Sequence, residues 1–403
     1  MPQYSIFQKG RPIYLDYQST TPLFPEVLDA MIPYFTERFG NPHSKGHYYG
    51  WDANEAIGLA RRSLASLIGA MENEIIFTSG ATESNNLAIK GTARMHRTDQ
   101  SRKQKNHIIT CVTDHKCVLE SCAKLENEGF NITYLPVSVN GLIKLEDIDE
   151  AITDKTILVS IMSVNNEIGV IQPLAEIGDI CRKRDIFFHT DAAQAVGKIQ
   201  LDVNEMGIDL LSISGHKFYG PKGIGALYIR RRPRVRLDPL FSGGGQEKNL
   251  RSGTLATPLC VGLGKAAEIA SLDLDDEAIR LNCLRDRFLD ILISRVSEVT
   301  INGDLYNRVP GNLNLSFSGV AADSLMGSLK DLALASGAAC SSGSNEPSHV
   351  LRALGISDDL SNSTIRIGFG RFTSEEDMEF AANAIADEVL RQRSNLGYRA
   401  PAA

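Results

Sequence analysis

The sequence contains no uninterrupted apolar run of the ~18 residues that a membrane span requires. Its first residues, 1–11, are polar and lack the apolar stretch of a secretory signal. We therefore expect no membrane insertion and no export, and we expect the protein to be cytoplasmic.

Cysteine is scarce and irregularly placed. The chain has 7 cysteines, an odd number, and no two of them have C-x-x-C spacing. This pattern argues against a disulfide framework and for a reducing compartment. Cys181 and Cys260 lie in apolar surroundings and are expected to be small core residues.

Excess positive charge is also missing, since the net charge is -7. An acidic chain disfavours nucleic acid as a direct partner. One stretch, residues 230–236, is nonetheless rich in arginine. We interpret it as a solvated turn that leaves a strand; a docking patch for an acidic protein is the alternative.

What the chain does contain is a regular alternation of short β-rich runs and helical patterns over its first two thirds. This alternation is typical of βαβ units, and it predicts an α/β fold with a mainly parallel sheet. The apolar spacing predicts helices over residues 56–68 and 174–181. The expected strands are residues 74–78, 107–112, 156–164, 186–190, 209–214 and 225–230.

The pattern changes after about Pro258, where a second domain is expected to begin, because 403 residues exceed the usual size of a single core. A helical pattern over residues 261–270 is followed by a charged stretch, 273–277, and by another long helix. Two strands follow, at 312–317 and 364–369. They flank a loop at 336–347 whose Gly, Ala and Ser content is typical of a mobile functional segment.

An acid and a lysine end two neighbouring strands of the predicted sheet. Asp191 closes the run 186–191, and Lys217 closes the run 208–217. Ligands of open α/β sheets bind at the carboxyl ends of strands. A lysine at such a strand end suits a Schiff base with pyridoxal 5'-phosphate (PLP), and the acid suits its protonated ring nitrogen. The simpler alternatives are a surface lysine and a helix N-cap.

The phosphate of such a cofactor has candidate donors. Residues 79–83 join a strand to a helix, and small residues there, Ala81 and Thr82 among them, let backbone N–H groups approach an anion. An ordinary helix cap explains the same residues. Ser214 and His216 lie beside Lys217 and offer further donors.

Three more polar residues follow strands of the same sheet. His115 is either structural or placed to stack on the ring and move protons. Asn166 is expected to bond the ring oxygen or the substrate. Gln194 reaches the ring oxygen or completes the cap at Asp191.

Two residues of the second domain suggest the substrate. Cys340 stands among small polar residues in the loop, as an accessible thiolate nucleophile requires. Arg366 emerges from an apolar strand and suits the bidentate binding of a substrate carboxylate; a salt bridge is the alternative.

Taken together, these motifs resemble the cysteine desulfurases of the PLP fold-type I, class V aminotransferase superfamily, specifically the housekeeping group that supplies sulfur for iron–sulfur clusters. The resemblance runs almost from end to end. The matching segments are residues 14–17, 20–22, 77–86, 164–169, 189–194, 212–225, 243–255 and 336–344.

The resemblance implies a PLP-dependent transferase fold with a mainly parallel seven-stranded sheet in the large domain and a smaller α+β C-terminal domain. The implied divisions are an N-terminal arm, residues 1–20, that packs with the small domain, a large PLP-binding domain, 21–262, and a small domain, 263–403. The last of these carries the mobile catalytic loop, 336–347.

By position, the resemblance also implies the roles of the site residues. The catalytic residues are Lys217, His115 and Cys340, with Lys217 joined to PLP and His115 stacked on its ring. Arg366 and Asn166 bind the substrate. The cofactor-binding set is Ala81, Thr82, His115, Asn166, Asp191, Gln194, Ser214, His216, Lys217 and Thr254, the last from the second subunit of a homodimer.

The implied reaction converts L-cysteine to L-alanine, with sulfur carried on Cys340 as a persulfide. Cys340 is also the implied transient ligand of a [2Fe–2S] cluster. The implied partners are an iron–sulfur scaffold protein and other sulfur acceptors, tRNA thiolation relays among them. The chain ends soon after Arg393, which makes docking of the scaffold through a longer C-terminal tail less secure.

Three alternatives remain. A selenocysteine lyase and a class V aminotransferase share the fold, although transamination needs no loop cysteine. The third alternative is a non-catalytic assembly scaffold, in which Lys217, Asp191 and His115 would have no catalytic role.

Overall fold

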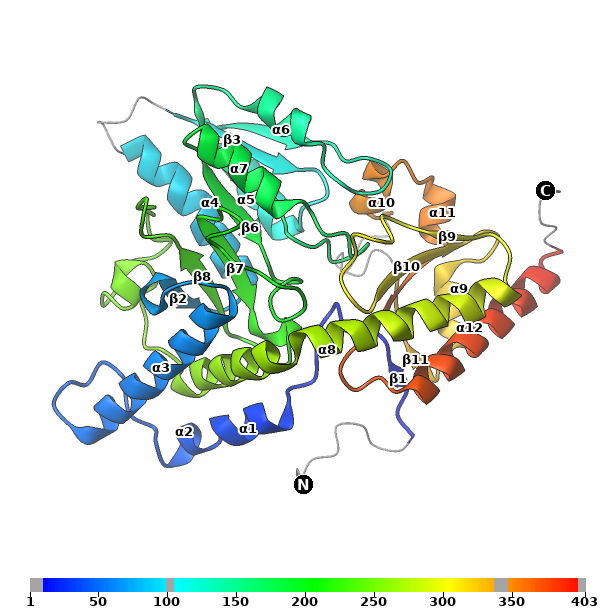
Figure 1. The fold of residues 1–403 in the computed structure, drawn as a ribbon, viewed down its shortest axis with the longest axis horizontal. Coiled ribbons are helices and arrows are strands. Elements are labelled where there is room, and N and C mark those ends of the chain that lie inside the picture. Colours follow the sequence, from blue (N-terminus) through cyan, green and yellow to red (C-terminus); the bar gives the residue numbers. More distant parts are fainter. Residues whose placement is uncertain (1–9, 99–104, 337–346, 398–403) are drawn as a thin grey trace.

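The computed structural model describes residues 10–98, 105–336 and 347–397 (Figure 1). Its centre is a seven-stranded sheet with the order β2-β8-β7-β6-β5-β3-β4. Strand β8 runs antiparallel to β2 and β7, and the remaining neighbours are parallel, which confirms the predicted α/β fold. The strands are β2 (Ile75–Thr78), β3 (His107–Cys111), β4 (Asn131–Leu135), β5 (Thr156–Ser160), β6 (Phe187–Asp191), β7 (Leu210–Ser214) and β8 (Gly225–Ile229).

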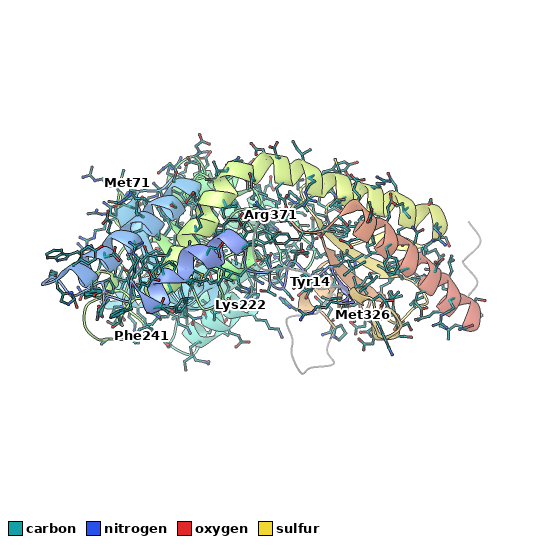
Figure 2. The ribbon with its side chains drawn as sticks, turned by 90° about the horizontal axis from the view of Figure 1, so that it is seen from below. Tyr14, Met71, Lys222, Phe241, Met326 and Arg371 are labelled. Carbon is teal, nitrogen blue, oxygen red and sulfur yellow. The ribbon has the colours of Figure 1, made fainter. Side chains whose placement is uncertain are left out.

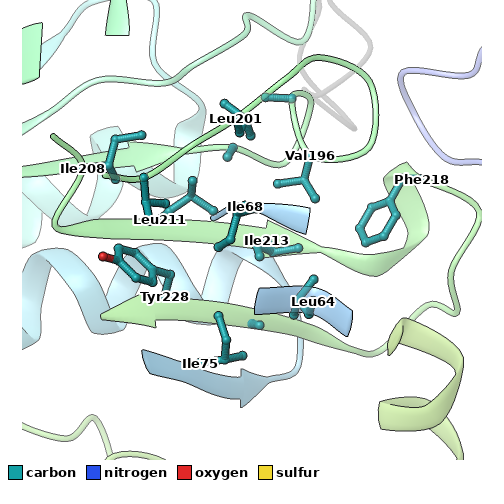
Figure 3. Packing of buried hydrophobic residues seen from close by; sticks show 14 of the residues in the cluster. Leu64, Ile68, Ile75, Val196, Leu201, Ile208, Leu211, Ile213, Phe218 and Tyr228 are labelled. Atoms are coloured by element: carbon teal, nitrogen blue, oxygen red, sulfur yellow. The ribbon is translucent and has the colours of Figure 1, made fainter. Parts of the chain in front are cut away.

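Helices cover both faces of this sheet, so its central strands are buried on both sides. One core lies between the sheet and α4 and α5. The other lies between the sheet and α3, α6, α7 and the start of α8 (Figure 3). The helices of this region are α1 (Pro25–Met31), α2 (Pro33–Thr36), α3 (Tyr48–Leu67), α4 (Ala81–Thr98), α5 (Lys116–Glu126), α6 (Leu145–Ala151) and α7 (Leu174–Lys183), with the 3-10 helices η1 (Glu72–Glu74), η2 (Gly215–Lys217) and η3 (Glu247–Asn249).

Strand periodicity distributes the side chains between the two cores. Leu211 and Ile213 of β7 pack in the core on the α3 side, whereas Leu210 packs in the core on the α4 side. Successive residues of a strand point to opposite faces. Leu64, Ile68 and Leu211 are fully buried in the core on the α3 side, whose packing is drawn in Figure 3.

A separate core lies under a four-stranded antiparallel sheet with the order β12-β13-β10-β9. Strand β1 of the N-terminal segment pairs with β11 and joins this part of the molecule. In Figure 2, Tyr14 and Arg371 lie where the two parts meet. The elements are β1 (Ile13–Tyr14), β9 (Val299–Ile301), β10 (Asn312–Phe317), β11 (Leu332–Ala333), β12 (Ala335–Ser336), β13 (Thr364–Gly368), α9 (Ala322–Ser328), α10 (His349–Ala353), α11 (Asp358–Asn362) and α12 (Glu375–Asn395).

A single helix, α8 (Thr257–Arg295), runs along both parts (Figure 1). The sequence pattern predicts two helices separated by the charged stretch 273–277, and that prediction is wrong. Asp273, Asp275 and Asp276 are exposed, so they stay solvated on one side of the helix, and no Gly or Pro interrupts residues 265–295. The expected division between residues 262 and 263 falls within α8.

Strand β4 was not predicted from the sequence. It lies at the edge of the seven-stranded sheet, and most of its side chains are partly exposed, so the apolar signal is weak. The arginine stretch 230–236 forms the expected turn after β8. Across the described ranges, no helix combines the length and the apolar character needed to cross a membrane.

Candidate active site

A cavity of about 460 Å³ opens at the carboxyl ends of β6 and β7. It brings together side chains from segments far apart in the chain, because the ends of parallel strands meet at one edge of the sheet. The cofactor-site residues predicted from the sequence that line it are Ala81, Thr82, His115, Asn166, Asp191, Gln194, Ser214, His216 and Lys217.

Asp191 is the last residue of β6 and is 5% exposed. Its Oδ2 accepts a hydrogen bond from Asn85 Nδ2 at 2.6 Å, and its Oδ1 accepts one from the Ala193 backbone N–H at 2.9 Å. The bond from the Ala193 N–H is the kind of contact expected of a helix N-cap, which is the simpler role that the sequence offered for Asp191. The two bonds hold the carboxyl group at the cavity wall, as a partner of a cationic ring nitrogen requires.

Lys217 lies in the single turn η2, directly after β7, and is half-buried. Its Nζ donates to the backbone carbonyls of Gln18 at 2.8 Å and Ser19 at 2.7 Å. The N-terminal segment thus holds the amine at the cavity. Both of these acceptors are neutral backbone carbonyl groups.

His115 caps the N-terminus of α5. Its Nδ1 accepts from the backbone N–H of Cys117 at 3.2 Å and lies 3.0 Å from Cys117 Sγ. Burial lowers the pKa of the imidazole, so the ring is neutral near neutral pH. With Nδ1 as the acceptor, the remaining proton lies on Nε2.

The first turn of α4 forms another side of the cavity and begins at Ala81. The first N–H groups of a helix lack intrahelical acceptors and favour an anion. His216 Nδ1 lies 3.0 Å from Thr20 Oγ1. Burial, with a smaller contribution from Lys217, lowers the pKa of His216 to about 4, so this residue is a neutral donor.

Thr254 is exposed and lies apart from the described residues that line the cavity. Its contribution to a second subunit stays a prediction. Cys340 lies outside the described residues, and its role stays a prediction as well.

Arg366 lies beside the cavity rather than in its lining. It is 1% exposed, donates from Nη1 to the backbone carbonyl of Asn166 at 2.9 Å, and pairs with Asp16. Its Nε has no hydrogen-bond partner among the described residues. The salt-bridge alternative therefore describes the arrangement seen here, and the substrate role stays a prediction.

Sequence reasoning did not identify several residues that shape the cavity, namely Gln18, Asn85 and Cys117. Gln18 contributes a carbonyl group, which any residue type provides, so no sequence signal exists for it. Asn85 was inside the matched segment 77–86, and its spacing of four from Ala81 places it one helical turn inward. Burial, and then Asp191, raise the pKa of the Cys117 thiol to about 12, so it stays protonated.

The family model for class-V aminotransferases matches residues 13–380. The chain is 59% identical over 382 residues to a cysteine desulfurase IscS of Rickettsia akari, covering 95% of this chain and 92% of that one. A solved NifS-like protein superposes with a TM-score of 0.86 at 34% identity and covers 94% of this chain and 100% of its own. A structure described as SspA in complex with cysteine has a TM-score of 0.79 at 42% identity, with 90% and 99% covered.

The chain therefore belongs to the class-V aminotransferase family. Within that family its relatives are cysteine desulfurases, PLP-dependent enzymes.

The residues at the cavity fit PLP. An amine, a buried carboxyl group, an imidazole and the start of a helix correspond to the four parts of the cofactor that need partners: aldehyde, ring nitrogen, ring face and phosphate. Asn85 Oδ1, next to Asp191, is a buried acceptor without a partner among the described residues. The polar groups at this cavity therefore suit PLP, and they do not suit an apolar ligand.

Proposed function

We propose that this chain removes sulfur from L-cysteine, releases L-alanine and carries the sulfur on Cys340 as a persulfide. The observation that carries the proposal is the convergence of Lys217, Asp191 and His115 on one cavity, in a chain of the class-V aminotransferase family. The loop cysteine distinguishes this reaction from transamination, which needs no thiol.

When bound, PLP supplies an electron sink for the negative charge that forms at the substrate Cα. Lys217 takes the Cα proton once its amine is free. Asp191, held by Asn85 and the Ala193 N–H, keeps a proton at the ring nitrogen. His115, neutral with its proton on Nε2, would lie against the ring of bound PLP and hold a proton donor near the reacting atoms.

The sulfur transfer itself belongs to Cys340. Its thiolate attacks the substrate sulfur, a new S–S bond forms, and the C–S bond breaks with its electron pair moving to the carbon. Protonation of that carbon skeleton yields L-alanine. Arg366 binds the substrate carboxylate in this scheme, and its buried position favours the interaction because little water competes there.

We further propose that the chain acts in the cytoplasm as a homodimer in which Thr254 of each subunit completes the other's phosphate site. The persulfide passes to acceptors for iron–sulfur cluster assembly, through a scaffold protein, and to thiolation of tRNA. During cluster transfer, Cys340 becomes a transient ligand of a [2Fe–2S] unit.

The test is turnover of L-cysteine in the presence of a thiol reductant, with alanine and sulfide counted separately. We expect equal amounts of the two products from the wild type. Cys340→Ser should release neither, whereas Cys283→Ser, a change at an exposed free cysteine, should leave turnover intact. Normal sulfide release by Cys340→Ser would sink the proposal.

A further inference from the structure

Lys198 does not line the predicted cofactor cavity, but it contacts Gln194, which does. It lies in the turn that follows β6, four residues after Gln194, and its Nζ donates to Gln194 Oε1 at 2.9 Å. Gln194 is 3% exposed and lines the 460 Å³ cavity. The contact therefore joins a lysine outside the cavity to an amide inside it.

The amide of Gln194 makes a second contact, on its other side. Its Nε2 donates at 2.8 Å to the Gln18 carbonyl, which also accepts from Lys217 Nζ at 2.8 Å. One carbonyl oxygen thus connects the amide to the lysine that is predicted to bind PLP.

An amide group has two orientations of nearly equal shape, and its neighbours decide between them. An ammonium group has three donors and no acceptor. Because Lys198 Nζ donates to Gln194 Oε1, the amide oxygen faces away from the cavity wall toward Nζ. The N–H donors must then face Gln18 and the cavity, where an electron-rich ring oxygen needs a donor.

We propose that Lys198 is a positioning residue that holds the Gln194 amide with its N–H donors facing the cofactor. This role rests on the proposed binding of PLP in the cavity. Lys198 does not touch the reacting atoms and acts only through Gln194.

The surroundings of Lys198 support a specific role for this side chain. Lys198 lines a second, small cavity of about 30 Å³ between the Gln18 segment and α8, together with Glu277 and Arg371. Burial, with smaller contributions from the charges of Lys217 and Arg366, lowers the pKa of the Lys198 amine to about 7. A lysine in such a place costs free energy, which a purely structural apolar residue would avoid.

The experiment compares PLP binding by apoenzyme, measured by equilibrium dialysis, in single and double variants. We expect Lys198→Met to weaken PLP binding about tenfold, as loss of the hydrogen bond that orients a buried amide predicts. Lys198→Arg should retain most of the affinity, because arginine also has hydrogen-bond donors and no acceptor. Lys183→Met, at an exposed lysine of α7, is the matched control and should change nothing.

The double variant separates positioning from general damage. In a Gln194→Ala background, Lys198→Met should cause no further loss of affinity, because the amide that Lys198 orients is gone. An equal loss in both backgrounds would overturn the proposal. Should Lys198→Met fail to fold, Lys198→Gln replaces it, since an amide both donates and accepts and therefore permits the flipped Gln194.

Failure of this proposal is distinguishable from failure of the proposed function. Wild-type protein that binds PLP but produces no alanine from L-cysteine refutes the function alone. Wild-type turnover combined with unchanged PLP affinity in Lys198→Met refutes the positioning role alone.

Discussion

Arg366 and Asp16 form an ion pair in which Nη2 lies 2.7 Å from Oδ1. The pair joins strand β13 to the segment that follows β1, and the same guanidinium reaches the Asn166 carbonyl beside the cavity. One side chain thus links the small sheet, the N-terminal segment and the wall of the active site.

Asp16→Asn should destabilise the protein, because it leaves the fully buried guanidinium of Arg366 without its counter-ion. Breaking one partner of a buried pair costs about 3–5 kcal/mol. We expect the free energy of unfolding, from urea titration of the apoenzyme, to fall by about 3 kcal/mol, since Asp16 is partly exposed and water compensates in part. A decrease no larger than that of Asp358→Asn, at an exposed pair, would contradict this expectation.

Arg366→Met should raise KM for L-cysteine by about tenfold to a hundredfold, as loss of a charge-assisted bond to the substrate carboxylate requires. Affinity for PLP should change little, because Arg366 lies outside the cavity lining. Steady-state kinetics on cofactor-saturated protein measure KM, and equilibrium dialysis of the apoenzyme measures the affinity for PLP. An unchanged KM with lower stability would leave Arg366 with a structural role only.

Asn85→Leu should weaken PLP binding by about tenfold, because Asp191 loses the hydrogen bond that fixes its Oδ2. Cys117 Sγ loses a donor at 3.1 Å in the same change. Equilibrium dialysis of the apoenzyme measures the affinity. Asn86→Leu, at the next position of α4, is the control and should bind PLP like the wild type.

Glu247→Ala should destabilise the segment that carries Thr254. Glu247, Lys248 and Asn249 all have positive φ, at 45°, 59° and 66°, which is unfavourable for residues other than glycine. The carboxylate of Glu247 holds this segment by accepting from Arg61 at 2.7 and 2.9 Å and from the Phe77 N–H at 2.7 Å.

We expect the free energy of unfolding of Glu247→Ala to fall by about 3 kcal/mol, because the partly buried guanidinium of Arg61 and the buried N–H of Phe77 lose their acceptor. Glu72→Ala removes an exposed partner of Arg62 and should cost at most about 1 kcal/mol. Urea titrations of the two variants provide the comparison. Similar losses of unfolding free energy would show that the hydrogen bonds of Glu247 contribute little to stability.

His189 should make stability depend on pH in the acid range. It is fully buried between Ser160 and Ser212, and burial lowers the pKa of its imidazole to about 3. An unfolded histidine takes up a proton near pH 6.5, whereas the folded one does not. The stability that the neutral form contributes is therefore complete above about pH 6.5 and is lost as the pH falls toward about 3.

The loss reaches ~4–5 kcal/mol when the folded and unfolded pKa values differ by about 3.5. The NMR signals of the His189 imidazole should be those of the neutral ring from about pH 8 to about pH 5. His189→Gln should have a shallower decline of unfolding free energy over the same range. A His189 signal that titrates near pH 6.5 would rule out this source of acid sensitivity.

Much of this protein follows from local sequence. Alternating apolar runs predict the strands of the large sheet because strand and helix periodicities are local properties, and Asp191 and Lys217 stand where two such strands end. The number of strands in that sheet, seven, was predicted from the family resemblance and not from periodicity. Edge strand β4 lacked the apolar signal, and α8 continued through a charged stretch that solvent accommodates.

Other features were decided only by tertiary structure. The carbonyls of Gln18 and Ser19 bind Lys217 across 199 and 198 residues of sequence, and a backbone carbonyl leaves no trace in residue type. Arg366 could be chosen as a cation, but only packing gave it Asp16 as partner. The sequence by itself thus determined which chemical groups the site has, because side-chain identity is local. Their partners, exposure and protonation depend on which distant segments the fold brings within a few ångströms.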